Sequence, residues 1–156
     1  MALEVSFGLL AAHPACQSII AEWLRSEWPS WYGAGGRGNA EEDVLKYSQV
    51  DHLPLGVLAF ADGIPCAFGS LKEDKVPGFE HATPWLGAGY VVPELRGQGI
   101  GLGLVKALEN EAARLGYTSP CFATSTAHSL MARAGWSYAG ASSLGGAEVA
   151  IFQKAP

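Results

Sequence analysis

The sequence contains few of the residues that stabilise disulfide-rich or metal-dependent proteins. Its three cysteines, Cys16, Cys66 and Cys121, are far apart and form no CxxC pair. This pattern argues against a disulfide framework and against a zinc site, so we expect buried, reduced thiols and no metal.

Basic residues are also scarce. Ten Lys and Arg stand against fifteen Asp and Glu, which gives a formal net charge of −5. A protein that holds nucleic acid through its phosphates needs a basic face, so nucleic acid is not an expected partner and a small or cationic substrate fits better.

Long apolar runs are missing as well. No stretch approaches the roughly 20 apolar residues that span a bilayer, and no basic region precedes an apolar run at the N-terminus. We therefore expect a cytoplasmic protein without a membrane partner.

What the sequence does contain is typical of a folded enzyme-sized domain. Hydrophobic residues make up 49% of the 156 residues and charged residues 16%, which is far from the composition of disordered chains. There is no internal repeat or low-complexity tract. We expect one domain over residues 1–156.

Turn and cap residues divide the N-terminal part of the chain. Pro29 should end a helix before it, Asn39 is suited to cap the next helix, and the pair Asp62-Gly63 favours a two-residue hairpin turn. The predicted elements are a strand over 3–10, a helix over 13–28, a flexible loop over 29–40, a short helix over 41–50, and strands over 55–61 and 64–71.

The C-terminal part contains a strand, helix and strand unit, which implies parallel pairing of its two strands. The predicted elements are a strand over 85–92, an amphipathic helix over 98–115, a strand over 119–123, a helix over 126–134 ending at Gly135, and strands over 136–139 and 149–152. The fold class is therefore α/β (α+β), with a mixed sheet of about seven strands and about four helices.

A glycine-dense segment leaves the strand over 85–92 and enters the long helix. Glycines let the backbone approach a ligand closely, and the first turn of a helix presents unpaired N–H groups that favour a diphosphate. Neither Gly97 nor Gly99 is followed by glycines at both the second and fifth positions, so the segment is not a dinucleotide fingerprint. It also lacks the Gly-Lys-Ser/Thr ending of a nucleotide P-loop.

The segment Arg96-Gly97-Gln98-Gly99-Ile100-Gly101, with its Val-x-Pro-Glu lead-in, resembles the Arg/Gln-x-x-Gly-x-Gly/Ala signature of the GCN5-related N-acetyltransferase (GNAT) family. The resemblance implies the acyl-CoA N-acyltransferase fold and acetyl-CoA as co-substrate. The implied coenzyme-binding residues are Tyr90, Val91 and Val92 for the pantetheine arm and Arg96, Gly97, Gln98, Gly99, Ile100, Gly101 and Leu102 for the diphosphate.

The same resemblance extends to two neighbouring features. In the family, the strand before the glycine-rich segment diverges from its neighbour at a bulge, which Gly87 and Gly89 would ease here. Residues 124–136 are similar to a late helix with a Leu-Tyr-x-x-x-Gly-Phe ending, but Met131 stands where many members carry a tyrosine that protonates the coenzyme thiolate. The general acid is therefore left open.

Several polar residues are candidates for the chemistry of acetyl transfer, and each also has an ordinary structural explanation. Glu80 and His81 precede the predicted strand over 85–92, a region from which the family often draws its base. His128 is an alternative base or coenzyme contact, Ser129 an alternative hydrogen-bond donor to the thiolate, and Tyr138 an alternative acid.

Aromatic residues gather around the end of the first helix, where the family commonly builds its acceptor pocket. Trp28, Trp31 and Tyr32 are the candidate pocket residues, and Glu27 and Asp43 are suited to attract an ammonium group. The alternative is that these rings cover the core.

The resemblance implies an N-acetyltransferase in which the primary amine of a small molecule or a peptide N-terminus attacks directly in a ternary complex. A non-catalytic acetyl-CoA sensor or regulatory module and a transferase of longer acyl groups remain alternatives. Family members often form homodimers, and residues 140–146 do not decide whether this chain does.

Overall fold

The computed structural model describes residues 3–156 and contains one mixed seven-stranded sheet in the order β1-β2-β3-β4-β5-β7-β6. Its strands are β1 (Val5–Leu9), β2 (Leu55–Ala61), β3 (Ile64–Lys72), β4 (Trp85–Val91), β5 (Cys121–Thr124), β6 (Ser137–Leu144) and β7 (Ala147–Gln153). Its α-helices are α1 (Gln17–Glu27), α2 (Pro29–Tyr32), α3 (Ala40–Lys46), α4 (Ile100–Arg114) and α5 (His128–Arg133). The seven strands and the α/β class confirm the prediction.

The hairpin of β2 and β3 is confirmed at its turn. Asp62 and Gly63 have φ angles of 50° and 81°, the left-handed conformations that a tight hairpin requires. The cap at Asn39 is also confirmed, because its side-chain oxygen accepts a hydrogen bond from the Glu42 N–H at 3.0 Å.

The prediction of a loop over the whole of residues 29–40 is wrong in its first part. Pro29 begins the short helix α2, because its fixed φ suits the first turn of a helix. This helix is additional to the four that the sequence predicts. The following helix α3 ends at Lys46 instead of near residue 50, since Ser48 forms a bridge to Leu55.

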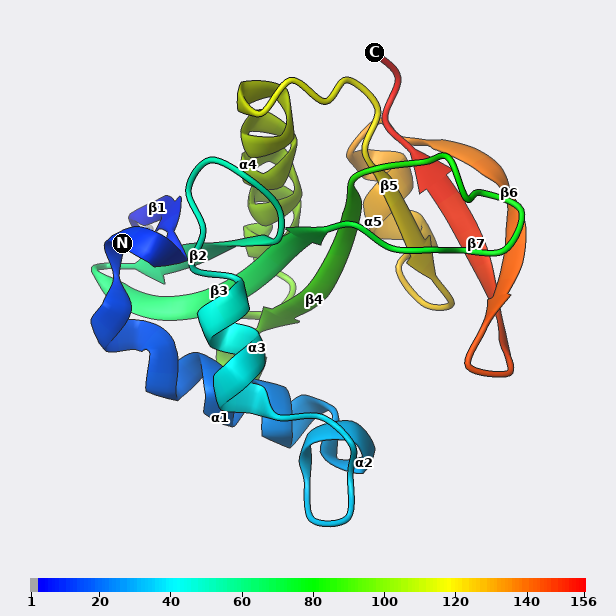
Figure 1. Cartoon of the computed structure of the whole chain (residues 1–156). Helices are drawn as coiled ribbons and strands as arrows, with labels where there is room; N and C mark the ends of the chain where they lie inside the picture. The colour runs from blue at the N-terminus through cyan, green and yellow to red at the C-terminus, as the bar shows by residue number, and fades with distance from the viewer. Residues whose placement is uncertain (1–2) are drawn as a thin grey trace.

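Two layers of helices cover the sheet. Figure 1 shows α4 standing on one face and α1, α2 and α3 on the opposite face. Under α4, Leu104 and Leu108 pack in the same core cluster as Val57 of β2. On the opposite face, Leu24 of α1 packs in one cluster with Leu58 of β2. Burial of each such side chain contributes about 1.5–3 kcal/mol, so both faces of the sheet are held by apolar contact.

The two central strands separate soon after they meet. β4 and β5 are parallel and share a single pair of residues, Trp85 and Cys121. Further along β4, the register with β3 shifts between Phe68 and Ser70, where Ala88 adopts a φ of 50°. The predicted bulge in this strand is therefore present, and it lies where β4 has no partner on its β5 side.

The last two strands are longer than predicted. β6 and β7 form a hairpin over residues 137–153, with Gly145 and Gly146 at positive φ in its turn. Most of β6 is made of small and polar residues, so it lacks the apolar alternation by which strands are found in a sequence. Within residues 3–156, no helix has the length and apolar character needed to cross a membrane.

Candidate active site

The largest cavity near the glycine-rich segment lies between the diverging strands β4 and β5. This cavity, called the central cavity below, has a volume of about 700 Å³. From the sheet it is lined by residues 86–91 of β4 and residues 122–124 of β5, and from the two helical layers by Gly101, Leu104, Val105 and Leu108 of α4 and by Glu27 and Trp28 at the end of α1. The cavity is thus bordered by helices from both faces of the sheet.

The start of α4 presents a row of free backbone donors. The first helical hydrogen bond runs from the Gly103 N–H to the Gly99 carbonyl at 3.1 Å. Throughout residues 3–156, no acceptor is bonded to the N–H groups of residues 97–102. These donors lie at the positive end of the helix dipole and are suited to a diphosphate.

Two glycines shape this row of donors, here called the N–H cradle (residues 97–102). Gly97 and Gly99 have φ angles of 79° and 84°, which other residues adopt only with strain. A Cβ atom at either position would meet no atom within 4 Å, so the surface there is open. Glycine is required by the backbone conformation, and the open surface admits a ligand.

Arg96 connects the N–H cradle to the neighbouring strand. Its Nε donates a hydrogen bond of 2.8 Å to the Val91 carbonyl, and its guanidinium carbon lies 5.5 Å from the centre of the Tyr90 ring. Its Nη2 is 3.8 Å from an oxygen of Glu27. The guanidinium is therefore held beside the cavity between β4 and the end of α1.

Glu27 is the only carboxylate that lines this cavity among the described residues. It stands next to Trp28, the one member of the predicted aromatic pocket that reaches the cavity wall. A carboxylate beside an indole ring is a combination that can hold a cation. The end of α1 is thus the acidic side of the cavity.

The other two aromatic candidates lie elsewhere. The Trp31 side chain is 49% exposed and does not line the cavity. The Tyr32 hydroxyl donates a hydrogen bond of 2.6 Å to Asp43. Burial, followed by this bond and the negative charge of Asp43, raises the pKa of Tyr32. Tyr32 therefore joins α2 to α3.

The candidate bases Glu80 and His81 line a separate cavity of about 580 Å³, together with Glu73, Asp74 and Lys75. Glu80 accepts a hydrogen bond of 3.0 Å from the Gly78 N–H. Backbone N–H groups lower the pKa of Glu80, which favours its charged form. The structure does not bring these two side chains to the wall of the central cavity.

The residues of α5 and of its N-cap that line the central cavity are not the ones that were predicted from the sequence. Ala127 and Leu130 line the cavity, whereas His128 and Ser129 are exposed and do not. Tyr138 is 63% exposed and packs edge-on against Phe152, with ring centres 6.0 Å apart.

Met131, at the position of the family's tyrosine, is fully buried in the core cluster beneath α4. Its side chain does not line the cavity.

Thr124 is a cavity residue that sequence reasoning missed. Its side chain is 7% exposed, and its hydroxyl oxygen accepts hydrogen bonds from the N–H groups of Thr126 and Ala127 at 3.1 and 2.9 Å. The hydroxyl proton remains available to donate, because within residues 3–156 no acceptor is bonded to it. The signal was a threonine at the end of a strand, where a short turn leads into the next helix and a hydroxyl commonly accepts hydrogen bonds from nearby backbone N–H groups.

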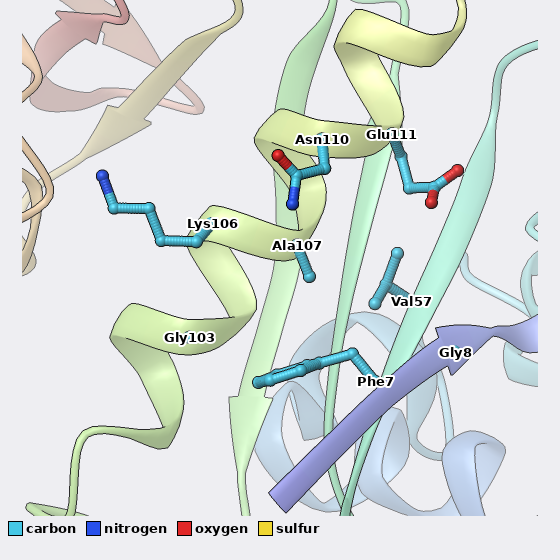
Figure 2. A pocket seen from close by; sticks show the side chains of 8 residues that line it. All are labelled: Phe7, Gly8, Val57, Gly103, Lys106, Ala107, Asn110 and Glu111. Atoms are coloured by element: carbon cyan, nitrogen blue, oxygen red, sulfur yellow. The ribbon is translucent and has the colours of Figure 1, made fainter.

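A second hollow lies beside α4 at the edge of the sheet. Figure 2 shows the Phe7 ring of β1 lying across α4 at Gly103, with Glu111 and Asn110 above it and Lys106 extending away. The Lys106 amine donates to the Ala134 carbonyl at 2.8 Å, outside this hollow. Among the described residues that line this hollow there is no cradle of free N–H groups, and the hollow is a packing groove of about 380 Å³.

Solved structures with the same fold are similar over almost the whole chain. An aminoglycoside 6'-N-acetyltransferase complexed with coenzyme A has a TM-score of 0.75 and 16% identity, with 97% of this chain and 96% of that chain covered. A protein from Salmonella typhimurium with its cofactor acetyl-CoA has a TM-score of 0.73, 17% identity and coverages of 99% and 94%. A GCN5-related N-acetyltransferase from Kribbella flavida has a TM-score of 0.73, 17% identity and coverages of 99% and 98%.

At these identities the likeness establishes the fold alone. No curated protein matches the sequence at a significant level. The model of the acetyltransferase (GNAT) family matches residues 19–136, a segment that includes the N–H cradle and both sides of the central cavity. Because this match covers most of the chain, the protein belongs to the acetyltransferase (GNAT) family.

Proposed function

We propose that this protein transfers the acetyl group of acetyl-CoA to the primary amine of a small molecule or of a peptide N-terminus. The observation that carries the proposal is the central cavity, which joins the N–H cradle on one face of the sheet to the carboxylate of Glu27 on the other. One side is suited to an anionic coenzyme and the other to a cationic acceptor.

The residues around the N–H cradle fit coenzyme A. The free N–H groups of residues 97–102 and the guanidinium of Arg96 supply donors and positive charge for its diphosphate. The unpaired side of β4 around Tyr90 and Val91, continuing to Val92, supplies backbone groups for an extended pantetheine arm. Acetyl-CoA, as co-substrate, would supply the thioester that the amine attacks.

The protein's own groups then serve the two sides of the transfer. A neutral amine is needed for attack, and the departing sulfur needs a donor. Glu27 and Trp28 lie on the α1 side, where an amine would enter, and Thr124 of β5 lines the cavity with a hydroxyl proton that is free to be donated. Thr124 therefore supplies the hydrogen bond to sulfur that the buried Met131 does not.

Thiol release from acetyl-CoA, measured with a panel of amines, amino acids, polyamines and peptides, tests this proposal. Gly101→Glu should abolish both thiol release and coenzyme binding, because a carboxylate in the first turn of α4 repels the diphosphate. Gly101 is helical, so this change avoids the backbone strain expected at Gly99. Asn110→Glu, an acidic substitution on the exposed side of α4, is the control and should leave both unchanged.

Two outcomes would contradict the proposal. If the wild type binds no coenzyme A, the cradle is not a coenzyme site. Tight binding without turnover across the panel would favour the sensor module instead, a reading supported by the buried Met131 at the tyrosine position. Faster thiol release from a longer acyl-CoA would identify the alternative donor.

A further inference from the structure

We propose that Glu27 exchanges its ion pair with Arg96 for a second, non-reacting ammonium group of the acceptor when the coenzyme binds. This inference rests on the proposed function. It assigns the acceptor to the class of diamines and larger polyamines, and it couples acceptor binding to coenzyme binding through the two side chains.

The Arg96–Glu27 ion pair is weak enough for each side chain to exchange its partner. The distance of 3.8 Å between Nη2 and the carboxylate oxygen is at the long end for an ion pair, and the two side chains are 50% and 41% exposed. Exposed pairs of this kind contribute at most about 1 kcal/mol. A coenzyme diphosphate carries more than one negative charge and so competes effectively for the guanidinium.

Arg96 is placed to change partners without leaving its position. It directly precedes Gly97, the first residue of the N–H cradle, and its Nε remains bonded to the Val91 carbonyl at 2.8 Å. The Nη atoms can therefore turn from Glu27 toward a diphosphate at the cradle while the rest of the side chain stays against β4. Coenzyme binding would remove the positive partner of Glu27.

The carboxylate that is left would face the cavity beside Trp28. Glu27 is the only carboxylate in the lining of the cavity within the described chain, so its charge would be uncompensated until a cation arrives. An indole ring next to a carboxylate favours an ammonium group. Before the coenzyme binds, Arg96 occupies this position and opposes acceptor binding.

The cation held by Glu27 is not the reacting amine. A carboxylate stabilises the charged form of a neighbouring amine and raises its pKa, whereas attack on a thioester requires the neutral form. An acceptor with two amines satisfies both needs, since one ammonium group pairs with Glu27 while the other amine loses its proton to water and attacks the thioester carbon. The carbon–nitrogen bond forms, the carbon–sulfur bond breaks, and coenzyme A leaves as a thiolate that takes up the second proton of the amine.

Calorimetry of coenzyme A binding, without any acceptor, is the first test. In Glu27→Gln, Arg96 loses its competing partner, so coenzyme A should bind about two- to fivefold more tightly than to the wild type. Glu22→Gln, on the exposed side of α1, is the matched control and should bind coenzyme A as the wild type does. A residue that only supports the fold would weaken binding when replaced.

Steady-state kinetics with 1,4-diaminobutane and butylamine is the second test. Glu27→Gln should raise the KM for the diamine about tenfold more than the KM for the monoamine, so that the preference of the enzyme for the diamine is lost. Wild-type coenzyme binding with no gain in Glu27→Gln, or an equal rise in KM for both amines, overturns this inference alone. A wild type that binds no coenzyme A overturns the proposed function as well.

Discussion

At the scale of single residues, the clearest polar contact outside the site is the hydrogen bond from Tyr32 to Asp43. It joins α2 and α3 beside the end of α1. The raised pKa of Tyr32 means that the folded protein holds the phenol proton more tightly than the unfolded chain does. Burial raises the pKa of Tyr47 as well, so both phenols act in the same direction.

The raised pKa of Tyr32 implies that its contribution to stability falls at alkaline pH. The contribution of Tyr32 is fully present below its unfolded pKa of about 10 and is lost as pH rises through the higher folded value. Tyr32→Phe should therefore cost about 1 kcal/mol at pH 8 and less at pH 11. Urea unfolding at the two values of pH measures the difference.

Tyr138→Phe is the matched control, because the side chain of Tyr138 is 63% exposed and no hydrogen bond of its hydroxyl is present in the described structure. It should leave the free energy of unfolding unchanged at both pH values. An equal cost of Tyr32→Phe at pH 8 and pH 11 would refute the assigned role of the hydrogen bond.

At the scale of elements, the bulge of β4 determines the shape of the site. Two residues of β4, Ala88 and Gly89, stand opposite Gly69 of β3, and the strand turns away from β5. The position with the positive φ is occupied by Ala88 instead of by one of its glycine neighbours. The strand therefore holds some backbone strain where it borders the cavity.

Ala88→Gly should relieve this strain. Left-handed backbone angles at an alanine cost about 1–2 kcal/mol, and glycine would remove this cost. Glycine also makes the unfolded chain more flexible, which offsets about 0.5–1 kcal/mol of the gain. The expected result is a rise of about 0.5 kcal/mol in the free energy of unfolding. Ala141→Gly in β6, at an exposed position without positive φ, should lower it instead. Equal losses in both variants would show that Ala88 is unstrained.

At the scale of the whole molecule, the central cavity interrupts the sheet that holds the two halves together. β4 and β5 share one residue pair, so the joint between residues 5–91 and the C-terminal strands depends on the packing of α4 and on the buried cluster of Val76, Trp85, Cys121 and Ile151. A ligand that contacts both sides of the cavity would add contacts across this joint. Ligand binding should therefore raise the free energy of global unfolding.

Coenzyme A at about 100 times its dissociation constant should stabilise the protein by about 2.7 kcal/mol, which for a chain of this length raises Tm by about 5–10 °C. Differential scanning fluorimetry measures the shift. Gly101→Ala, whose Cβ would lie 3.8 Å from Leu130, should retain the shift, and Gly101→Glu should lose it. A shift of the same size in Gly101→Glu would place the coenzyme elsewhere.

Local patterns allowed much of this fold to be predicted. The turn at Asp62-Gly63, the cap at Asn39 and the glycines at 97 and 99 each act within a few residues, so the sequence reveals them directly. Two misses have the same local origin. The helix α2 begins at Pro29, the same proline that ends α1, and β6 has too few apolar residues to show a strand period.

The order of the seven strands and of the other four helices, the N–H cradle and the resemblance that the family match confirms could all be predicted, because they depend on neighbours along the chain. Which side chains share the cavity became known from the packing of the whole chain. It brought Glu27 to Arg96 and Thr124 to the cavity wall, and it placed Glu80 and His81 in another cavity. These relations depend on how far β4 and β5 diverge and on how the helices pack against them, which no local pattern encodes.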